Sequence, residues 1–157
     1  MKKVLFVSST GGHLNELLQL KKTMKKYDSY LITEKTKSTK KLKTEFKNIK
    51  FFKYGTKSHI SYIYIFPYNC IKGLYYLLKI NPDVIVTTGA HTGTIMCYIG
   101  KIFRKKIIFI ETFANINSKS MSGRLVYPIA DLFIVQWKNM LKQYPKAQYW
   151  GWIFWYL

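Results

Sequence analysis

The chain has 157 residues, 48% of them hydrophobic, which is enough for one compact core and too few for two ordinary domains. Its 26 lysines and arginines against 7 acidic residues give a formal net charge of +19, so we expect an anionic partner: nucleic acid, acidic lipid headgroups or a phosphorylated substrate. The two cysteines lie in apolar segments and no signal sequence precedes the first predicted strand, which favours a reduced, cytosolic setting over a disulfide framework.

The first predicted elements are a strand at residues 4–7 and a helix that begins near Leu14, joined by a loop of small residues. In this loop, Gly11 and Gly12 allow backbone N–H groups to approach a ligand closely, at a helix N-terminus that favours anions. We therefore expect a phosphate or diphosphate there, and the alternative is an ordinary turn at a helix start. The nucleotide P-loop and the three-glycine dinucleotide pattern are both absent.

A lysine-rich stretch follows, with predicted strands at residues 28–33 and 49–54. Between Lys21 and Lys57 there are 13 lysines against three acidic residues. This concentration of charge has two interpretations. It is either a solvated lysine face or a surface that attaches to an anionic membrane.

Residues 60–80 are almost all apolar or aromatic and include five tyrosines and one phenylalanine. The segment is long enough to cross a membrane, but Pro67 breaks it and a central lysine such as Lys72 costs roughly 2.5 to 3.5 kcal/mol on insertion scales. We expect an interfacial or buried helix that begins near Pro67. Tyrosine suits a boundary between water and lipid, so we expect peripheral membrane binding; ordinary packing on a sheet is the alternative.

The second half alternates strands with helices, which predicts a parallel α/β sheet. Ligands bind such sheets at the carboxyl ends of the strands, where polar clusters follow several of the predicted strands. The predicted strands are 83–87, 106–110 and 131–135, and the predicted helices end near residue 103 and span about 122–130.

Several of these polar clusters, together with their neighbours, resemble the acceptor-binding, membrane-associating subunit of split GT-B glycosyltransferases. The matching segments are residues 10–13, 88–93, 111–114, 122–124, 131–137 and 149–151. This group includes a eukaryotic subunit that acts on dolichol-diphosphate sugar and bacterial subunits from capsule and exopolysaccharide loci. Its unsplit relative is the peptidoglycan lipid-intermediate N-acetylglucosaminyltransferase. The resemblance implies a Rossmann-like parallel sheet with helices on both faces, equivalent to the N-terminal half of a GT-B enzyme.

The resemblance also implies a site for the diphosphate of a lipid-linked acceptor. We assign to it Thr10, Gly11, Gly12, Asn15, Gly89, His91, Thr92, Gly93 and Thr94, with Ser122 and Arg124 as further polar contacts.

Two residues are candidates for catalysis. His13 follows the glycine turn and is placed to hydrogen-bond the acceptor. Glu111, at a strand end, is the candidate general base, and a helix-capping or lysine-paired carboxylate is the alternative. The three histidines lack metal-ligand spacing, so we expect no metal, and we expect no cofactor.

The resemblance implies that a separate subunit supplies the nucleotide-sugar site, and that the chain is inactive without it. We expect transfer from a UDP-sugar to a polyprenyl-diphosphate-linked saccharide in capsular or exopolysaccharide biosynthesis, at the cytoplasmic face of the cell membrane. Residues 1–151 form the predicted acceptor-binding domain. The aromatic tail, residues 152–157, either docks on the partner or packs back on its own domain. The predicted partner interface is Gln136, Trp137, Trp150, Trp152, Phe154 and Trp155.

Two other functions compete with this one. A basic nucleic-acid-binding domain would explain the charge, but no nucleic-acid-binding motif is present, and we expect no nucleic acid partner. A free-standing enzyme would need its own nucleotide site, and we expect no ribose-binding acid after the second strand.

Overall fold

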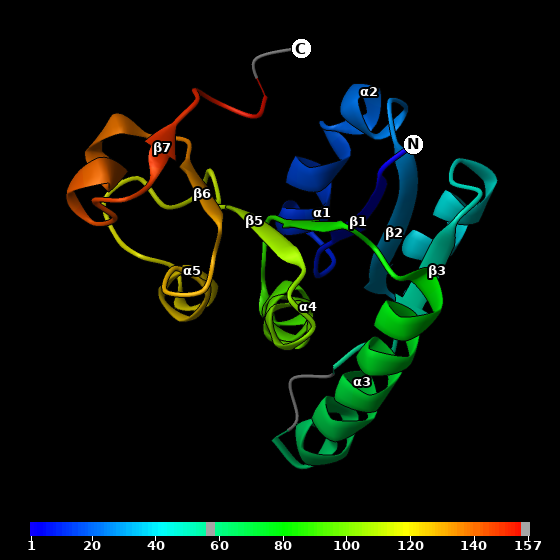
Figure 1. Ribbon diagram of the computed structural model, residues 1–157. Coiled ribbons are helices and arrows are strands. Elements are labelled where there is room, and N and C mark those ends of the chain that lie inside the picture. Colours follow the sequence, from blue (N-terminus) through cyan, green and yellow to red (C-terminus); the bar gives the residue numbers. More distant parts are fainter. Residues whose placement is uncertain (56–58, 155–157) are drawn as a thin grey trace.

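The computed structural model describes residues 1–55 and 59–154, and over these residues the chain forms one parallel sheet of seven strands. The order of strands is β3-β2-β1-β4-β5-β6-β7 (Figure 1). The parallel α/β prediction is confirmed. The strands are β1 (Lys3–Val7), β2 (Asp28–Glu34), β3 (Ile49–Phe52), β4 (Val84–Thr87), β5 (Lys106–Ile110), β6 (Leu132–Val135) and β7 (Gln148–Tyr149).

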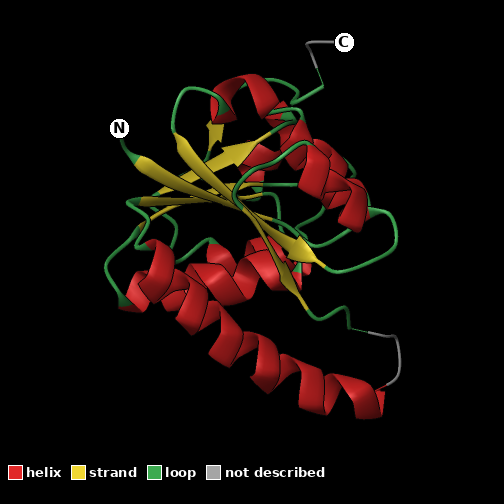
Figure 2. Ribbon diagram, turned by 90° about the vertical axis from the view of Figure 1, so that its right-hand side faces the viewer, coloured by secondary structure: helices red, strands yellow, loops and turns green. Residues whose placement is uncertain are grey.

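Helices cover both faces of the sheet, as Figure 2 shows and as the prediction required. Helices α1 and α2 pack on one face, and α3, α4 and α5 pack on the other. The α-helices are α1 (Gly12–Leu18), α2 (Lys21–Met24), α3 (His59–Ile80), α4 (His91–Ile102) and α5 (Met121–Val126), and two 3₁₀ helices are η1 (Thr39–Thr44) and η2 (Lys138–Lys142).

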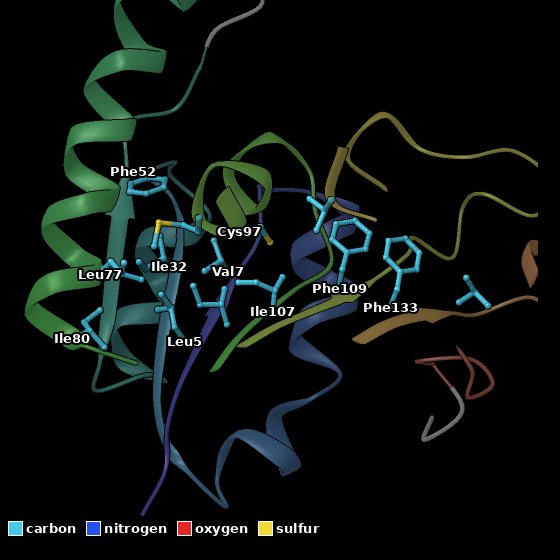
Figure 3. Packing of buried hydrophobic residues seen from close by; sticks show 14 of the residues in the cluster. Leu5, Val7, Ile32, Phe52, Leu77, Ile80, Cys97, Ile107, Phe109 and Phe133 are labelled. Carbon is cyan, nitrogen blue, oxygen red and sulfur yellow. The ribbon is translucent and has the colours of Figure 1, made fainter. Parts of the chain in front are cut away.

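The central strand β1 explains why the strands read as unbroken apolar runs. Its side chains alternate between the two faces, so Leu5 and Val7 join one buried cluster while Val4 and Phe6 join the other. Because both faces are covered by helices, both sets are buried. Figure 3 shows the cluster of Leu5 and Val7, which extends to Leu77 of α3 and Cys97 of α4.

The start of α3 differs from the prediction. The helix begins at His59 and contains Pro67 in its interior, instead of beginning near that proline. Proline removes one backbone donor from a helix, but Pro67 is exposed, so water can satisfy the carbonyl that loses its partner. Smaller shifts occur at other ends: β2 continues to Glu34, β3 ends at Phe52, and α5 stops at Val126.

The length and hydropathy of α3 bear on membrane crossing. Neither α3 nor any other helix among the described residues is both long and apolar enough to span a bilayer.

The sheet reverses its order between β1 and β4, which lie side by side with Val7 opposite Thr87. In open parallel sheets, ligands bind at the carboxyl ends of the strands beside such a reversal. The loops after β1, β4 and β5 all lie at this edge, and they contain most of the polar residues singled out in the sequence.

Candidate functional site

A cavity of about 630 Å³ opens beside the carboxyl ends of β1 and β4. Its polar lining comes from the starts of three helices, whereas its apolar lining comes from α3 and from the bodies of α4 and α5. The polar side chains are His13, His91, Thr94, Ser120 and Ser122, and the others are Phe66, Cys70, Ala90, Ile95, Tyr98, Ile99, Met121 and Leu125.

Gly89 brings three of these segments together. Its φ of +92° favours glycine, and a Cβ there would lie 2.9 Å from the Ser122 hydroxyl and 3.5 Å from the His13 ring. Its carbonyl also accepts a hydrogen bond of 3.0 Å from the Ser9 N–H. The loop after β1, the loop after β4 and the start of α5 therefore meet at one residue that has no room for a side chain.

His13 is held in one tautomer on the cavity wall. Its Nδ1 lies 2.8 Å from the Thr88 carbonyl, which can only accept, so Nδ1 donates. The Thr88 hydroxyl in turn donates to the His13 carbonyl at 2.7 Å. With Nδ1 carrying a proton, Nε2 is the ring nitrogen that can accept one from a bound hydroxyl.

Glu34 is a residue that the sequence reasoning missed. Its side chain is 2% exposed and accepts hydrogen bonds from the Thr10 N–H at 3.1 Å, the Thr10 hydroxyl at 2.9 Å and the Thr92 hydroxyl at 3.0 Å. His91 Nε2 lies 3.1 Å from the same carboxylate. Burial alone would raise the pKa of Glu34, but the hydrogen bonds from His91 and Thr10 outweigh it and lower the pKa below its ordinary value.

This carboxylate changes the expected role of two threonines. Glu34 is the last residue of β2, and its carboxylate is turned under the loops that follow β1 and β4. Thr10 and Thr92 were expected to bind diphosphate, and the structure commits both hydroxyls to Glu34. Glu34 thus joins the two glycine loops, and its position at a strand end was the available signal.

Glu111, the candidate base, lies in a different environment from the one expected. It is 1% exposed and is not among the cavity-lining residues. Its carboxylate accepts hydrogen bonds from the Tyr144 hydroxyl at 2.7 Å, the Thr112 N–H at 2.9 Å and the Ser120 N–H at 3.4 Å. Burial is the main reason that the pKa of Tyr144 is raised, and the hydrogen bond to Glu111 raises it further, so the phenol keeps its proton. This geometry fixes the start of α5 and supports neither lysine pairing nor direct contact with a substrate.

Glu16 is a second buried carboxylate that was missed, although it lies one turn after His13 on α1. It accepts hydrogen bonds from the Thr112 hydroxyl at 2.7 Å, the Phe113 N–H at 3.2 Å and Gln136 Nε2 at 3.1 Å. Burial raises the pKa of Glu16 despite these donors. Its place on the buried side of α1, beside Leu17, was a signal in the helical periodicity.

The predicted partner interface divides into a buried part and an exposed part. Gln136 is buried, and its Oε1 accepts a hydrogen bond of 2.8 Å from the Ile153 N–H. Trp137 donates to the Phe113 carbonyl at 2.8 Å. The rings of Trp152 and Phe154 pack on Phe113 with centroid distances of 5.7 and 5.4 Å. Residues 152–154 therefore contact their own domain, whereas residues 155–157 of the predicted tail lie outside the described residues.

The rest of that interface prediction concerns two tryptophans. Trp150 is 64% exposed, beside the packed segment. Trp155 lies outside the described residues.

The remaining predicted site residues fall into three groups. Thr94 lines the cavity, and its hydroxyl donates to the Ala90 carbonyl at 2.9 Å. Gly93 is buried where a Cβ would overlap the Thr87 hydroxyl, so it serves the packing of α4 on β4. Gly11, Gly12 and Asn15 are exposed at the start of α1. Over the described parts of the chain, no group of three acidic, cysteine or histidine side chains could hold a metal ion.

Solved structures with this fold include MurG and a UDP-N-acetylglucosamine 2-epimerase. MurG of Acinetobacter baumannii superposes with a TM-score of 0.70 and 13% identity over 88% of this chain and 43% of that one. UDP-N-acetylglucosamine 2-epimerase of Rickettsia bellii superposes with a TM-score of 0.74 and 14% identity, over 98% of this chain and 45% of that one. The chain thus spans less than half the length of these enzymes. At such identities the likeness shows the fold alone, and it confirms the predicted Rossmann-like fold of a GT-B half.

Sequence relatives give closer information. The chain is 26% identical to the UDP-N-acetylglucosamine transferase subunit ALG14 of Yarrowia lipolytica over 95% of its own length and 80% of the relative. It is also 37% identical to the subunit of the same name in Candida albicans, over 60% of the chain and 46% of the relative. A family model described as "Oligosaccharide biosynthesis protein Alg14 like" matches residues 4–153. The chain therefore belongs to the Alg14-like family of oligosaccharide biosynthesis proteins.

Proposed function

We infer that this chain is the acceptor-binding and membrane-recruiting subunit of a two-subunit inverting glycosyltransferase. It presents a polyprenyl-diphosphate-linked saccharide to a partner subunit that binds the UDP-sugar, and the names of its relatives favour N-acetylglucosamine as the sugar. Capsular or exopolysaccharide biosynthesis is the process we assign to it. The observation that carries the proposal is the cavity beside β1 and β4, which we call the acceptor cavity. It joins an apolar lining to polar side chains at the starts of α1, α4 and α5, with His13 among them.

The cavity has two chemistries that match the two parts of such an acceptor. The apolar side chains of α3, α4 and α5, among them Phe66, Ile95 and Leu125, suit an isoprenoid chain. The hydroxyls of Ser120 and Ser122, with the backbone of the loop before α4, suit the polar diphosphate. The saccharide then extends toward the carboxyl edge of the sheet, where a donor domain would close the site.

His13 supplies the chemistry that this subunit contributes. An inverting transfer needs the acceptor hydroxyl to lose its proton as its oxygen attacks C1 of the donor sugar. His13 Nε2 accepts that proton, while the Thr88 carbonyl holds the proton on Nδ1 and keeps the ring oriented. We assign Glu111 a positioning role, since its carboxylate anchors Ser120 instead of facing the cavity. The charge of the departing UDP is stabilised by the partner subunit.

Exposed apolar side chains support the membrane part of the proposal. On α3, Tyr64 is 74% exposed and Ile71 is 73% exposed, and Met121 of α5 is exposed beside the cavity. Exposed apolar side chains that gather on one side of a domain mark a contact with lipid or protein. Met121 itself lines the acceptor cavity, and α3 also supplies Phe66 and Cys70 to the lining. A lipid-borne acceptor would therefore enter from a membrane at the cytoplasmic face of the cell.

Exposed aromatic area supports the partner part. Trp150 is largely exposed and lines the same hollow as Trp152, whose ring packs on that of Trp137. Aromatic residues are enriched at the centres of protein interfaces. We assign this surface to the donor-binding subunit.

The test is a tagged pull-down from detergent-solubilised membranes, followed by a transfer assay with a lipid-diphosphate saccharide and UDP-sugars. The proposal predicts a protein with a nucleotide-sugar-binding domain and transfer only when both chains are present. Recovery of salt-resistant RNA without such a protein would instead support the nucleic-acid-binding alternative.

A further inference from the structure

A second cavity, also of about 630 Å³, lies at the β3 edge of the sheet between that strand and α3. We call it the edge hollow. It shares no lining residue with the acceptor cavity. Its lining consists of Lys35, Lys43, Ile49, Lys50, Phe51, Phe52, Lys53, Tyr54, Tyr68, Lys72 and Tyr76.

The edge hollow holds five lysines and no acidic residue. Among the described residues, no carboxylate forms an ion pair with any of the five, whereas Lys21, Lys101 and Lys106 elsewhere do have acidic partners. Five ammonium groups around one hollow repel one another, and the repulsion is strongest for those removed from water. An anion bound between them would relieve it.

Aromatic rings hold several of these ammonium groups in place. Lys72 Nζ lies 5.4 Å from the Tyr68 ring centroid and 5.7 Å from that of Tyr76, and Lys53 Nζ lies 6.0 Å from Tyr68. Lys72 and Lys50 are also half-buried. Cation–π contacts orient a lysine without neutralising it, so its charge stays available to a ligand. The hollow is thus a partly ordered set of positive charges and not only a mobile lysine surface.

The position of the hollow on α3 indicates the kind of anion. Tyr68, Lys72 and Tyr76 recur every four residues and face the hollow. Because an α-helix turns by about 100° per residue, Ile71 and Tyr75 lie on the adjoining stripe, and both are exposed. An anion that also carries an apolar part would place its charge in the hollow and its apolar part beside this stripe.

We propose that the edge hollow binds the phosphate headgroup of an anionic membrane lipid. The proposal rests on the membrane recruitment inferred above and gives that recruitment a defined site, separate from the acceptor cavity. Phosphate oxygens accept hydrogen bonds from Lys50 and Lys72, and Lys35, Lys43 and Lys53 add positive charge around them. The acyl chains lie against the exposed stripe of α3.

The test compares binding of the purified chain to phosphatidylcholine vesicles with and without phosphatidylglycerol, by co-sedimentation at fixed ionic strength. In K50Q/K72Q, binding to the anionic vesicles should fall about tenfold or more, because each lysine near the membrane surface adds to the attraction between the protein and anionic lipid. The matched control is K142Q/K146Q, which removes two exposed lysines near β7, at the opposite edge. It should change binding much less. K35Q/K53Q, at more exposed positions, repeats the test if the first variant is poorly folded.

Equal losses in the hollow and control variants would overturn the proposal while leaving membrane recruitment intact, because binding would then depend on overall charge alone. If the wild type binds neither vesicle, both the recruitment and the headgroup site fail. A titration with glycerol phosphate, monitored by the amide NMR shifts of residues 49–54, distinguishes a free phosphate from a lipid headgroup as the bound anion. Tight binding of the free phosphate without any preference for anionic vesicles would also contradict a lipid site.

Discussion

At the scale of single residues, the site depends on buried carboxylates that never reach the cavity. Glu34 holds the two glycine loops together, and Glu16 and Glu111 hold the loop after β5. These carboxylates shape the loops around the cavity, whereas His13 of α1 lies on the cavity wall.

Replacing His13 by alanine should therefore reduce transfer far more than assembly. General base catalysis contributes about a hundredfold or more to such reactions, so turnover of the complex should fall by that factor in H13A. The measurement is a transfer assay, with size-exclusion chromatography of the complex as the control. Unchanged turnover at full assembly would remove His13 from the reaction.

The two missed carboxylates should give opposite pH dependences of stability. The pKa of Glu34 is lowered in the folded state, so its contribution is present above the ordinary value of 4.5 and is lost as the pH falls through the folded pKa. The pKa of Glu16 is raised, so its contribution is present below 4.5 and is lost as the pH rises through the folded pKa.

Urea unfolding of the wild type, E34Q and E16Q across acidic to neutral pH tests this pair. The free energy of unfolding of the wild type should exceed that of E34Q by less as the pH falls. Compared with E16Q, the wild type should lose free energy of unfolding as the pH rises toward neutral. Parallel curves for both variants would contradict the assignment.

At the scale of elements, close packing of helices on strands places the loops. Gly93 allows α4 to approach β4 because a Cβ there would overlap the Thr87 hydroxyl. Gly12, at the start of α1, has nothing within 4 Å of where a Cβ would lie. These two helical glycines therefore have opposite requirements.

G93A should lower the free energy of unfolding by about 1–3 kcal/mol or more through overpacking. G12A should be neutral or raise it by up to about 1 kcal/mol, since alanine favours a helix over glycine. Chemical unfolding monitored by circular dichroism measures both. Equal effects of the two substitutions on the free energy of unfolding would contradict the tight packing of α4 on β4 at Gly93.

The elements also show what could and could not be predicted from the sequence. Strands such as β1 and β5 are apolar after their first residue because both faces of the sheet are covered, and their positions were predicted well. The start of α3 was misplaced because proline is typical of the first turn of a helix and disfavoured in its interior, whereas the exposed position of Pro67 tolerates it inside α3. Glu16 and Glu34 were missed because carboxylates are normally exposed, and their buried donors come from distant segments.

At the scale of the whole molecule, the chain has three surfaces of different chemistry. The helices α3 to α5 expose apolar side chains, the β3 edge is basic, and the region after β7 exposes aromatic area. In that last region, Trp137 is half-buried and hydrogen-bonded, whereas Trp150 is largely exposed. The two tryptophans should therefore respond differently to truncation.

W150A should weaken assembly with the donor-binding subunit by about 2 kcal/mol, as for an interface hot spot. The free energy of unfolding of the chain itself should change little. W137A should instead destabilise the chain itself, because Trp137 supports Phe113 and Trp152. Calorimetric binding and thermal unfolding of both variants separate the effects. Full partner affinity in W150A would exclude this surface as the interface.

One helix borders both cavities. Phe66 and Cys70 of α3 line the acceptor cavity, while Tyr68 and Lys72 line the edge hollow on another side of the same helix. A chain held by this helix at a bilayer would meet its anchoring lipid and its lipid-borne acceptor in the same leaflet. Capture of the acceptor would then be a search in two dimensions, and the rate of encounter would depend on the surface density of the acceptor in the leaflet instead of its concentration in bulk solution.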